Sequence, residues 1–273
     1  MMFVIRTVLL YTTAFFATVI LGLSVIIAAL LGIEDKPGGI YDNVPKWWSK
    51  AVLFAVGVKI RVHGMENVNS GEPHIFASNH VSWFDVPSLA STLPRNRFVA
   101  KSELFKVPIF GKAMRAAGMI EIQRENRKAA FGAYDVAAER IRGGKSVVVY
   151  PEGTRGFAYP LRPFKKGPFV LAIAAGVPIV PIILHGTIEV MPKGSWWAHS
   201  GTVDVHLLEP VSTTGVDYDH RETLMKTVRA RMADAMRDLY GVDPLPDAPP
   251  RLSSSAELVS SETAPTETRE QER

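Results

Sequence analysis

The sequence has no cysteine among its 273 residues. This absence excludes a disulfide framework, a thiol nucleophile, and zinc or iron–sulfur sites with cysteine ligands. Charge is also missing from the 27 consecutive residues between Arg6 and Glu34. A helix of that length reaches about 40 Å, against about 30 Å of bilayer hydrocarbon, and it exceeds the apolar core of a secretory signal peptide. We therefore expect a membrane anchor, with a helix over about residues 7–33.

A shorter apolar stretch follows, and it predicts an interfacial segment over about residues 46–58. Its run Ala51–Val58 cannot span a bilayer, and Trp47, Trp48 and Lys50 flank it. The same pattern also fits a core helix beneath the main domain. Residues 1–58 together form the predicted N-terminal hydrophobic anchor.

Basic residues are concentrated on the C-terminal side of the first apolar segment. Only Arg6 and the amino terminus precede it. Five cations follow it: Lys36, Lys46, Lys50, Lys59 and Arg61. The positive-inside tendency then places the main domain on the cytoplasmic face of the plasma (inner) membrane. A re-entrant hairpin of two segments would place both ends there as well.

The net charge of +4 divides unevenly along the chain. Residues 242–273 carry −4 and are rich in Pro, Ser, Thr and Glu, so we expect an acidic, disordered tail. The first 241 residues carry +8. Such a basic body suits an anionic membrane surface, phosphates or nucleic acid.

Residues 59–241 alternate between short apolar strands and segments of helical period, which indicates one α/β domain. Strands are expected at 60–63, 74–78, 97–100, 118–123, 146–150, 179–184 and 202–208. Asn126–Arg142 predicts a helix ended by Gly143–Gly144. Asp219–Tyr240 predicts another, with Asp219 and Glu222 as a capping pair. Its inward residues are expected to be Leu224, Val228, Met232, Ala235, Met236 and Leu239.

The first stretch with chemistry runs from Asn79 through His80 to Asp85. The strand expected at 74–78 ends at Ser78, so His80 lies in the loop that follows. If Asp85 caps a helix that begins at Val86, the loop curls His80 back toward the carboxylate. An Asp bonded to one imidazole nitrogen leaves the other able to take a proton. Taken alone, the spacing favours an ordinary helix cap beside a surface or packing histidine. A Ser82-based hydrolase is disfavoured because no G-x-S-x-G turn exists.

The second stretch is Glu152-Gly153-Thr154-Arg155, which follows an apolar strand, with Lys165 and Lys166 ten residues later. Backbone amides near the glycine and the three cations fit a phosphate pocket, because arginine grips a phosphate through two parallel hydrogen bonds. Taken alone, the stretch also fits a polar loop with solvated cations. The remaining histidines show no metal-ligand spacing, so no metal is expected.

These stretches occur in order with two others, Gly118–Arg124 and Val177–Pro181. Together they resemble the four motif blocks of the glycerolipid acyltransferases, and most closely the bacterial 1-acyl-sn-glycerol-3-phosphate acyltransferase family. The resemblance covers about residues 60–210 and the hydrophobic N-terminus. It departs at Glu121, where an aromatic or apolar residue is usual, and at Gln123, where Asp is frequent. Tyr150 and Gly156 replace the common Phe and Ser.

The resemblance implies an acyltransferase domain with a mixed β-sheet flanked by helices. It implies that His80 is the general base on the sn-2 hydroxyl of lysophosphatidate and that Asp85 steadies its imidazolium. Arg124 and Arg155 would bind the acceptor phosphate. Glu152 would hold the site's shape or contact the glycerol, while Gly153 and Thr154 would let the backbone approach the phosphate. Lys165 and Lys166 are further candidates, and Val177–Pro181 is expected to be structural.

The predicted reaction is acyl transfer from a thioester of acyl carrier protein or coenzyme A, with no cofactor, to give phosphatidate for phospholipid synthesis. Membrane lipids are expected partners and nucleic acid is not, since the cations form no recognisable nucleic-acid module. The alternatives are acylation of another lysolipid or of glycerol 3-phosphate, and a non-catalytic membrane lipid binder. A binder needs the cations but not the His80–Asp85 pair. Donor, chain length and oligomeric state stay open.

Overall fold

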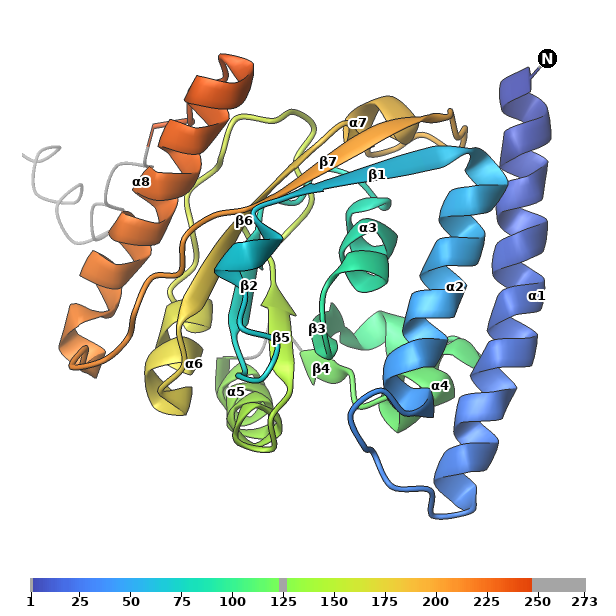
Figure 1. Cartoon of the computed structure of the whole chain (residues 1–273), viewed down its shortest axis with the longest axis horizontal. Coiled ribbons are helices and arrows are strands. Elements are labelled where there is room, and N and C mark those ends of the chain that lie inside the picture. The colour runs from blue at the N-terminus through green and yellow to red at the C-terminus, as the bar shows by residue number, and fades with distance from the viewer. Residues whose placement is uncertain (1, 123–126, 247–273) are drawn as a thin grey trace, which may run out of the picture.

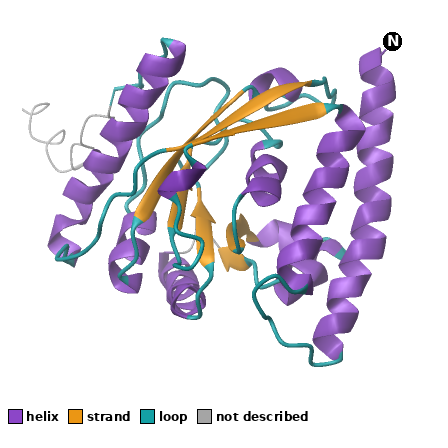
Figure 2. Ribbon diagram, in the orientation of Figure 1, coloured by secondary structure: helices purple, strands orange, loops and turns teal. Residues whose placement is uncertain are grey.

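The computed structural model describes residues 2–122 and 127–246. In this part of the chain a seven-stranded sheet carries helices on both faces (Figures 1 and 2). The strands are β1 (Val58–His63), β2 (Ile75–Ser78), β3 (Asn96–Lys101), β4 (Ile120–Ile122), β5 (Ser146–Val149), β6 (Ile179–His185) and β7 (Gly201–Leu207). The helices are α1 (Met2–Leu30), α2 (Ile40–Val56), α3 (Asp85–Thr92), α4 (Phe110–Ala116), α5 (Arg127–Arg142), α6 (Gly167–Ala175), α7 (Thr187–Val190) and α8 (Arg221–Tyr240).

The strand order is β1-β7-β6-β2-β5-β3-β4. All neighbouring pairs are parallel except β6 and β7, so the predicted α/β fold with a mixed sheet is confirmed. All seven expected strands are present, with ends shifted by two residues or fewer. The three central strands β2, β5 and β6 are buried almost throughout, which is typical of parallel strands covered on both faces.

Alternating residues of the central strands supply two separate cores. Ile75 and Val147 face a core closed by α5, α6 and α8. Phe76 and Val148 face the opposite core, closed by α1, α2 and α3. The period of two in a strand directs successive side chains to opposite faces. The second face, on the side of α1–α3, is where the cavity described below lies.

The N-terminal segments form two helices that differ from the expected bounds. α1 ends at Leu30 instead of about residue 33, and α2 begins six residues before the expected 46. α2 has the buried side that the core-helix interpretation requires, since Val52 and Val56 are fully buried in the core. Trp47 and Phe54 are exposed, and the interfacial interpretation stays a prediction. One amphipathic helix therefore both closes the core and presents aromatic side chains outward.

α1 and α2 form an antiparallel hairpin along the body of the molecule (Figure 1). Arg6 Nε donates to the carbonyl of Val56 at 3.0 Å, so the start of α1 lies beside the end of α2. Trp48 Nε1 donates to Thr18 Oγ1 at 3.0 Å near the middle of the pair. By length and composition, α1 is the one helix of the described chain that could cross a membrane.

Two expectations about α8 were wrong. The carboxylate of Asp217, not Asp219, accepts hydrogen bonds from the backbone at the start of this region, and α8 begins at Arg221. Glu222 pairs with Lys166 instead of closing a capping box. Leu239, expected to face inward, is 48% exposed, and Ala233 is buried in the core. The other inward residues pack as expected.

A buried ion network fastens the α1–α2 hairpin to the sheet. Arg97 on β3 is fully buried and contacts Asp35, in the α1–α2 connection, at 3.1 Å and Asp42, in α2, at 2.9 Å. Lys145 reaches Asp35 at 2.9 Å. Burial raises the pKa of the Asp35 carboxyl, but Lys145 and Arg97 more than offset it, so the pKa lies below its ordinary value.

Replacing Arg97 with leucine is expected to lower the free energy of unfolding by about 3–5 kcal/mol, because it removes the nearest cation from the buried Asp42 carboxylate. Denaturant unfolding of the detergent-solubilised protein measures this change. Lys36→Ala, which removes an exposed pair with Glu34, is the matched control and should change little. Equal stability of the two variants would contradict the proposed fastening role.

Candidate active site

The site lies at the carboxyl ends of two adjacent parallel strands. β2 ends at Ser78 and delivers Asn79 and His80, while β5 ends at Val149 and delivers Tyr150 and Glu152. The chain then leaves β2 toward α3 on one face and leaves β5 toward α6 on the other. Loops that diverge in this way open a crevice, the usual ligand position in sheets of this kind.

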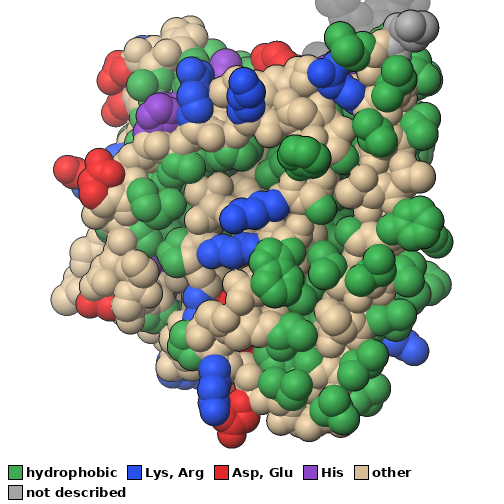
Figure 3. All heavy atoms as spheres, turned by 45° about the vertical axis from the view of Figure 1, so that its right-hand side comes forward, with side chains coloured by type: hydrophobic (Ala, Val, Ile, Leu, Met, Phe, Trp, Pro, Cys, Tyr) green, Lys and Arg blue, Asp and Glu red, His purple; other side chains and the backbone are tan. Residues whose placement is uncertain are grey.

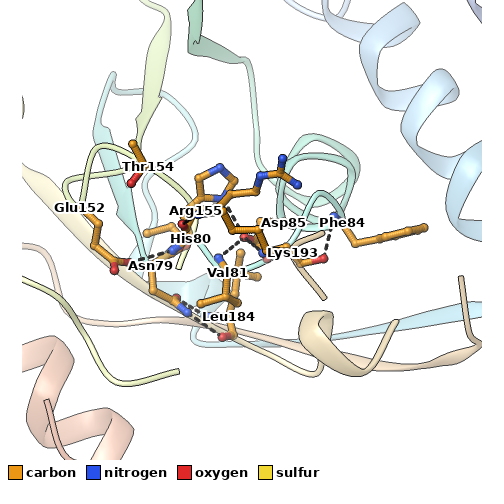
Figure 4. Close-up of polar contacts among 12 residues, drawn as sticks. Asn79, His80, Val81, Phe84, Asp85, Glu152, Thr154, Arg155, Leu184 and Lys193 are labelled. Carbon is orange, nitrogen blue, oxygen red and sulfur yellow. Dashed lines mark hydrogen bonds and ion pairs between the residues drawn. The ribbon is translucent and has the colours of Figure 1, made fainter. Parts of the chain in front are cut away.

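The structure brings His80 and Asp85 together (Figure 4). His80 Nδ1 lies 2.7 Å from Asp85 Oδ2, and the two side chains are 13% and 0% exposed. A carboxylate at this distance holds a proton on Nδ1, so Nε2 is left as the acceptor nitrogen. His80 lines a cavity. The pair has the geometry of a general base with its orienting carboxylate.

Asp85 does not occupy the helix-cap position that we expected. It is the first residue of α3, and its Oδ2 accepts hydrogen bonds from the backbone N–H groups of Val81 and Ser82 at 2.7 and 2.8 Å. These bonds fold the loop back and account for the five-residue spacing, which a regular helix does not align. The carboxylate therefore shapes the loop that presents His80.

Tyr150 supports the imidazole from one side. Its ring stacks on His80 with a centroid distance of 3.9 Å and an interplanar angle of 16°. Burial, with a contribution from the Asp85 charge, holds the pKa of the Tyr150 hydroxyl well above its ordinary value. Tyr150 therefore stays neutral and contributes a flat packing surface, not a proton, near neutral pH.

Glu152 is a buried bridge between the two loops. Its Oε1 accepts from the backbone N–H of His80 at 2.9 Å, and its Oε2 accepts from Arg162 Nε at 2.8 Å. Arg162 also donates to the hydroxyl and carbonyl oxygens of Thr154. Gly153 adopts a positive φ of 81°, where a side chain would be strained. Glu152 and Gly153 thus fix the loop shape.

Not all of the predicted phosphate-binding cations meet at the site. Thr154 and Arg155 line the cavity together with His80. Lys166 forms an exposed ion pair with Glu222 of α8. Lys165 donates its backbone N–H to Pro151 at 2.8 Å and is not among the residues that line the cavity. Arg124, and Gln123 beside it, lie outside the described residues.

A cavity of about 520 Å³ extends from His80 toward the N-terminal helices. Its walls are mostly apolar and include Leu21 and Val25 of α1, Trp48 of α2 and Met114 of α4. Lys101, Arg155 and Lys193 are its cationic lining residues. An apolar cavity of this size with a few convergent polar groups is typical of a site for a small or lipid-like ligand.

Four further residues at the site were missed as functional candidates. Tyr150 and Asn79 lie within the motifs, but their roles depend on contacts with residues far away in the sequence. Asn79, for example, exchanges hydrogen bonds with the backbone of Leu184 on β6. Arg162 is an isolated cation ten residues after Glu152. Lys193 comes from the loop after α7 and donates to the carbonyl of Arg155 at 2.8 Å. No local sequence signal could have found Lys193.

Spacing also failed to reveal a histidine cluster away from the site. His63 on β1 and His206 on β7 are register partners with stacked rings, and Asp204 lies beside them. One donor atom from each lies within 4.8 Å of the others, as in a metal site. Arg61, however, donates to both oxygens of Asp204, at 2.8 and 2.7 Å, so the carboxylate is engaged in an ion pair.

Comparison with known proteins places the domain and its fold in one class. Residues 59–185 match a family model described as Acyltransferase. A crystal structure of the 1-acyl-sn-glycerophosphate (LPA) acyltransferase PlsC from Thermotoga maritima superposes with a TM-score of 0.74 at 26% identity, covering 86% of this chain and 95% of that one. The chain is therefore an α/β protein with an acyltransferase domain.

The proteins related in sequence identify a narrower family than the domain match does. The human 1-acyl-sn-glycerol-3-phosphate acyltransferase beta is 30% identical over 76% of this chain and 76% of its own length. The Saccharomyces cerevisiae 1-acyl-sn-glycerol-3-phosphate acyltransferase is 31% identical over 72% and 68%. The chloroplastic BAT2 of Brassica napus is 32% identical over 71% of this chain, which spans 55% of that relative. The chain belongs to the 1-acyl-sn-glycerol-3-phosphate acyltransferase family.

Proposed function

We propose that the chain transfers an acyl group from a thioester to the sn-2 hydroxyl of 1-acylglycerol 3-phosphate and forms phosphatidate for phospholipid synthesis. The observation that carries this proposal is the His80–Asp85 pair, 2.7 Å apart, at an apolar cavity that Arg155 also lines. A lysophosphatidate carries a hydroxyl, a phosphate and an acyl chain. The base can accept the hydroxyl proton, the cation can bind the phosphate, and the apolar wall can contact the acyl chain.

In the proposed reaction, His80 Nε2 takes the proton of the sn-2 hydroxyl as its oxygen attacks the thioester carbonyl carbon. Asp85 stabilises the resulting imidazolium through Nδ1. The tetrahedral intermediate then expels the sulfur, which receives the proton from His80. One ester bond forms and one thioester bond breaks. The products are phosphatidate and the free thiol of acyl carrier protein or coenzyme A, and we propose no metal or cofactor.

The acceptor phosphate is proposed to bind Arg155, with Arg124 contributing as the family resemblance implies. Glu152 is engaged with His80 and Arg162, which favours its role in holding the site's shape over contact with glycerol. Gly153 and Thr154 set the course of the backbone beside Arg155. The apolar cavity is proposed to receive an acyl chain, since burial of each methylene contributes about 0.8 kcal/mol.

We propose that α1 and α2 hold the enzyme on the cytoplasmic face of the plasma (inner) membrane. α1 is packed from Thr7 to Ala28 against the body, so a perpendicular crossing would carry those neighbours into hydrocarbon. The Arg6–Val56 bond also places the start of α1 beside the end of α2. These features favour a hairpin lying in one leaflet over a single span. Lysophosphatidate would reach the cavity from that leaflet.

The proposal is tested with membranes that contain the wild-type enzyme, a labelled acyl thioester and lysophosphatidate. Acyl carrier protein and coenzyme A are compared as donors. Labelled phosphatidate from either donor supports the reaction, and the relative rates identify the donor. Wild-type enzyme that acylates glycerol 3-phosphate or a zwitterionic lysolipid, but not lysophosphatidate, would replace the proposed acceptor. Lipid binding without any transfer would favour the non-catalytic alternative.

Arg155→Ala is expected to lower kcat/KM for lysophosphatidate by about 10- to 100-fold, because hydrogen bonds between charged groups contribute about 1.5–3 kcal/mol. A zwitterionic lysolipid should be affected much less. Steady-state kinetics with both acceptors measures the difference. Lys166→Ala is the matched control, since Lys166 pairs with Glu222 outside the cavity. Equal losses for both acceptors would contradict a phosphate-specific role.

A further inference from the structure

Two loops that also hold cavity-lining residues carry exposed aromatic side chains. Trp196 and Trp197, in the loop between α7 and β7, are 75% and 49% exposed, and Phe157, in the loop after β5, is 73% exposed. We call these three residues the aromatic platform. None of them lines the cavity. Large aromatic groups left in water forgo substantial burial energy, and clusters of them mark surfaces with a partner.

Lys193 connects the platform to the active-site loop. Its ammonium lies 4.1 Å from the centroid of the Phe157 ring and donates to the carbonyl of Arg155 at 2.8 Å. Lys193 also lines the cavity, so Phe157 contacts a side chain of the same cavity that the predicted phosphate-binding arginine lines. Cationic groups beside exposed aromatic rings fit an anionic lipid surface.

The platform continues onto α1. Tyr11 Oη donates to the carbonyl of Trp196 at 3.1 Å, and the ring of Phe3 meets Trp197 edge-on at 5.4 Å. Further along α1, the outward side chains Phe15 and Phe16 are exposed. Figure 3 shows apolar side chains spread over this side of the molecule with basic side chains among them. The apolar surface is therefore continuous with the proposed membrane-anchoring helix.

We infer that the aromatic platform is a second membrane contact, which inserts into the headgroup region of an anionic phospholipid bilayer. Tryptophan favours this region because its ring is apolar and its N–H is polar. α1 and the platform then contact the bilayer on a continuous surface and fix the cavity opening against it. The inference rests on the proposed function in taking α1 as a membrane-anchoring helix and a membrane lipid as the acceptor.

The absence of cysteine permits a direct test. Trp196→Cys and Phe157→Cys each give one thiol for an environment-sensitive probe, and Leu239→Cys is the control. Leu239 is 48% exposed and lies on α8, across the molecule from α1 (Figure 1). The labelled full-length protein is reconstituted in vesicles of phosphatidylglycerol and phosphatidylethanolamine. Probes at 196 and 157 should be quenched by brominated lipid and shielded from an aqueous quencher, unlike the probe at 239. Equal aqueous quenching at all three positions would overturn the inference.

A kinetic test separates this contact from the chemistry. Trp196→Ser should lower kcat/KM by about tenfold for lysophosphatidate in vesicles, but leave it unchanged for a short-chain acceptor dispersed in water. Leu239→Ser should change neither value. Equal loss with both acceptors would overturn the membrane role. If the wild type forms no phosphatidate from either acceptor, the proposed function fails, while the probe measurement still decides the aromatic platform.

Discussion

Replacement of His80 with alanine is expected to lower the rate of phosphatidate formation by about 10²–10⁴-fold, the usual contribution of a positioned general base. The side chain makes one polar contact, with Asp85, and a stacking contact with Tyr150 among the described residues. Its removal therefore deletes the acceptor nitrogen without breaking the Glu152 bridge, which uses the His80 backbone. Initial rates at saturating acceptor, with acyl thioester as donor, measure the loss in kcat.

The chain offers a matched control for this variant. His220 Nδ1 lies 2.7 Å from Asp217 Oδ1, the same separation as in the His80–Asp85 pair. The side chains of His220 and Asp217 are both exposed, however. His220→Ala should retain wild-type turnover. Membrane association and the unfolding midpoint should match the wild type in both variants. Near-normal turnover of His80→Ala would exclude the base mechanism.

Asp85→Asn is expected to lower kcat by about 10²–10³-fold with little change in KM. The amide oxygen can still accept from Val81, Ser82 and His80, so the loop keeps its shape. The other oxygen, Oδ1, has no hydrogen-bond partner among the described residues, so an amide nitrogen there breaks no bond. What is lost is the negative charge beside the imidazolium, worth about 4 kcal/mol at an effective dielectric constant of 20.

Asp85→Ala separates the electrostatic role from the structural one. It removes the acceptor for two buried backbone N–H groups, and each unpaired group costs about 1–3 kcal/mol. Its unfolding midpoint should therefore lie clearly below that of Asp85→Asn, although both lose turnover. Equal kcat for Asp85→Asn and the wild type would show that the carboxylate acts only on the loop.

The strands could be predicted because their signal is local. Ile75–Ser78 and Ser146–Val149 are short apolar runs bounded by polar residues, and two covered faces require that pattern. Helix ends were less accurate. Asp219 and Glu222 match the pattern of a capping pair. In the structure, however, Glu222 forms an ion pair with Lys166, which comes from a distant part of the chain. A cap depends on a few weak contacts, so one tertiary partner can change it.

The site shows the same division between local and tertiary signals. The contact between His80 and Asp85 follows from the resemblance of the ordered motifs, since the spacing alone favours an ordinary helix cap. The support of His80 comes from β5 and its loop, through Tyr150 and Glu152, about 70 residues later. Arg162 and Lys193 reach the site only because their loops fold over it. Lys166 was a reasonable candidate by sequence, yet it lies in an exposed ion pair.

The sequence by itself determined the α/β class, the apolar N-terminal helix and the seven strands, because periodicity acts within a few residues. The histidine–aspartate pair was predicted from the resemblance of the ordered motifs. Only the tertiary structure decided that α1 and α2 form a hairpin packed on the body, and that Trp196 and Trp197 lie against α1. It also decided which cations line the cavity. Such contacts join residues far apart in the chain, and their energies depend on burial and neighbours that a linear pattern does not record.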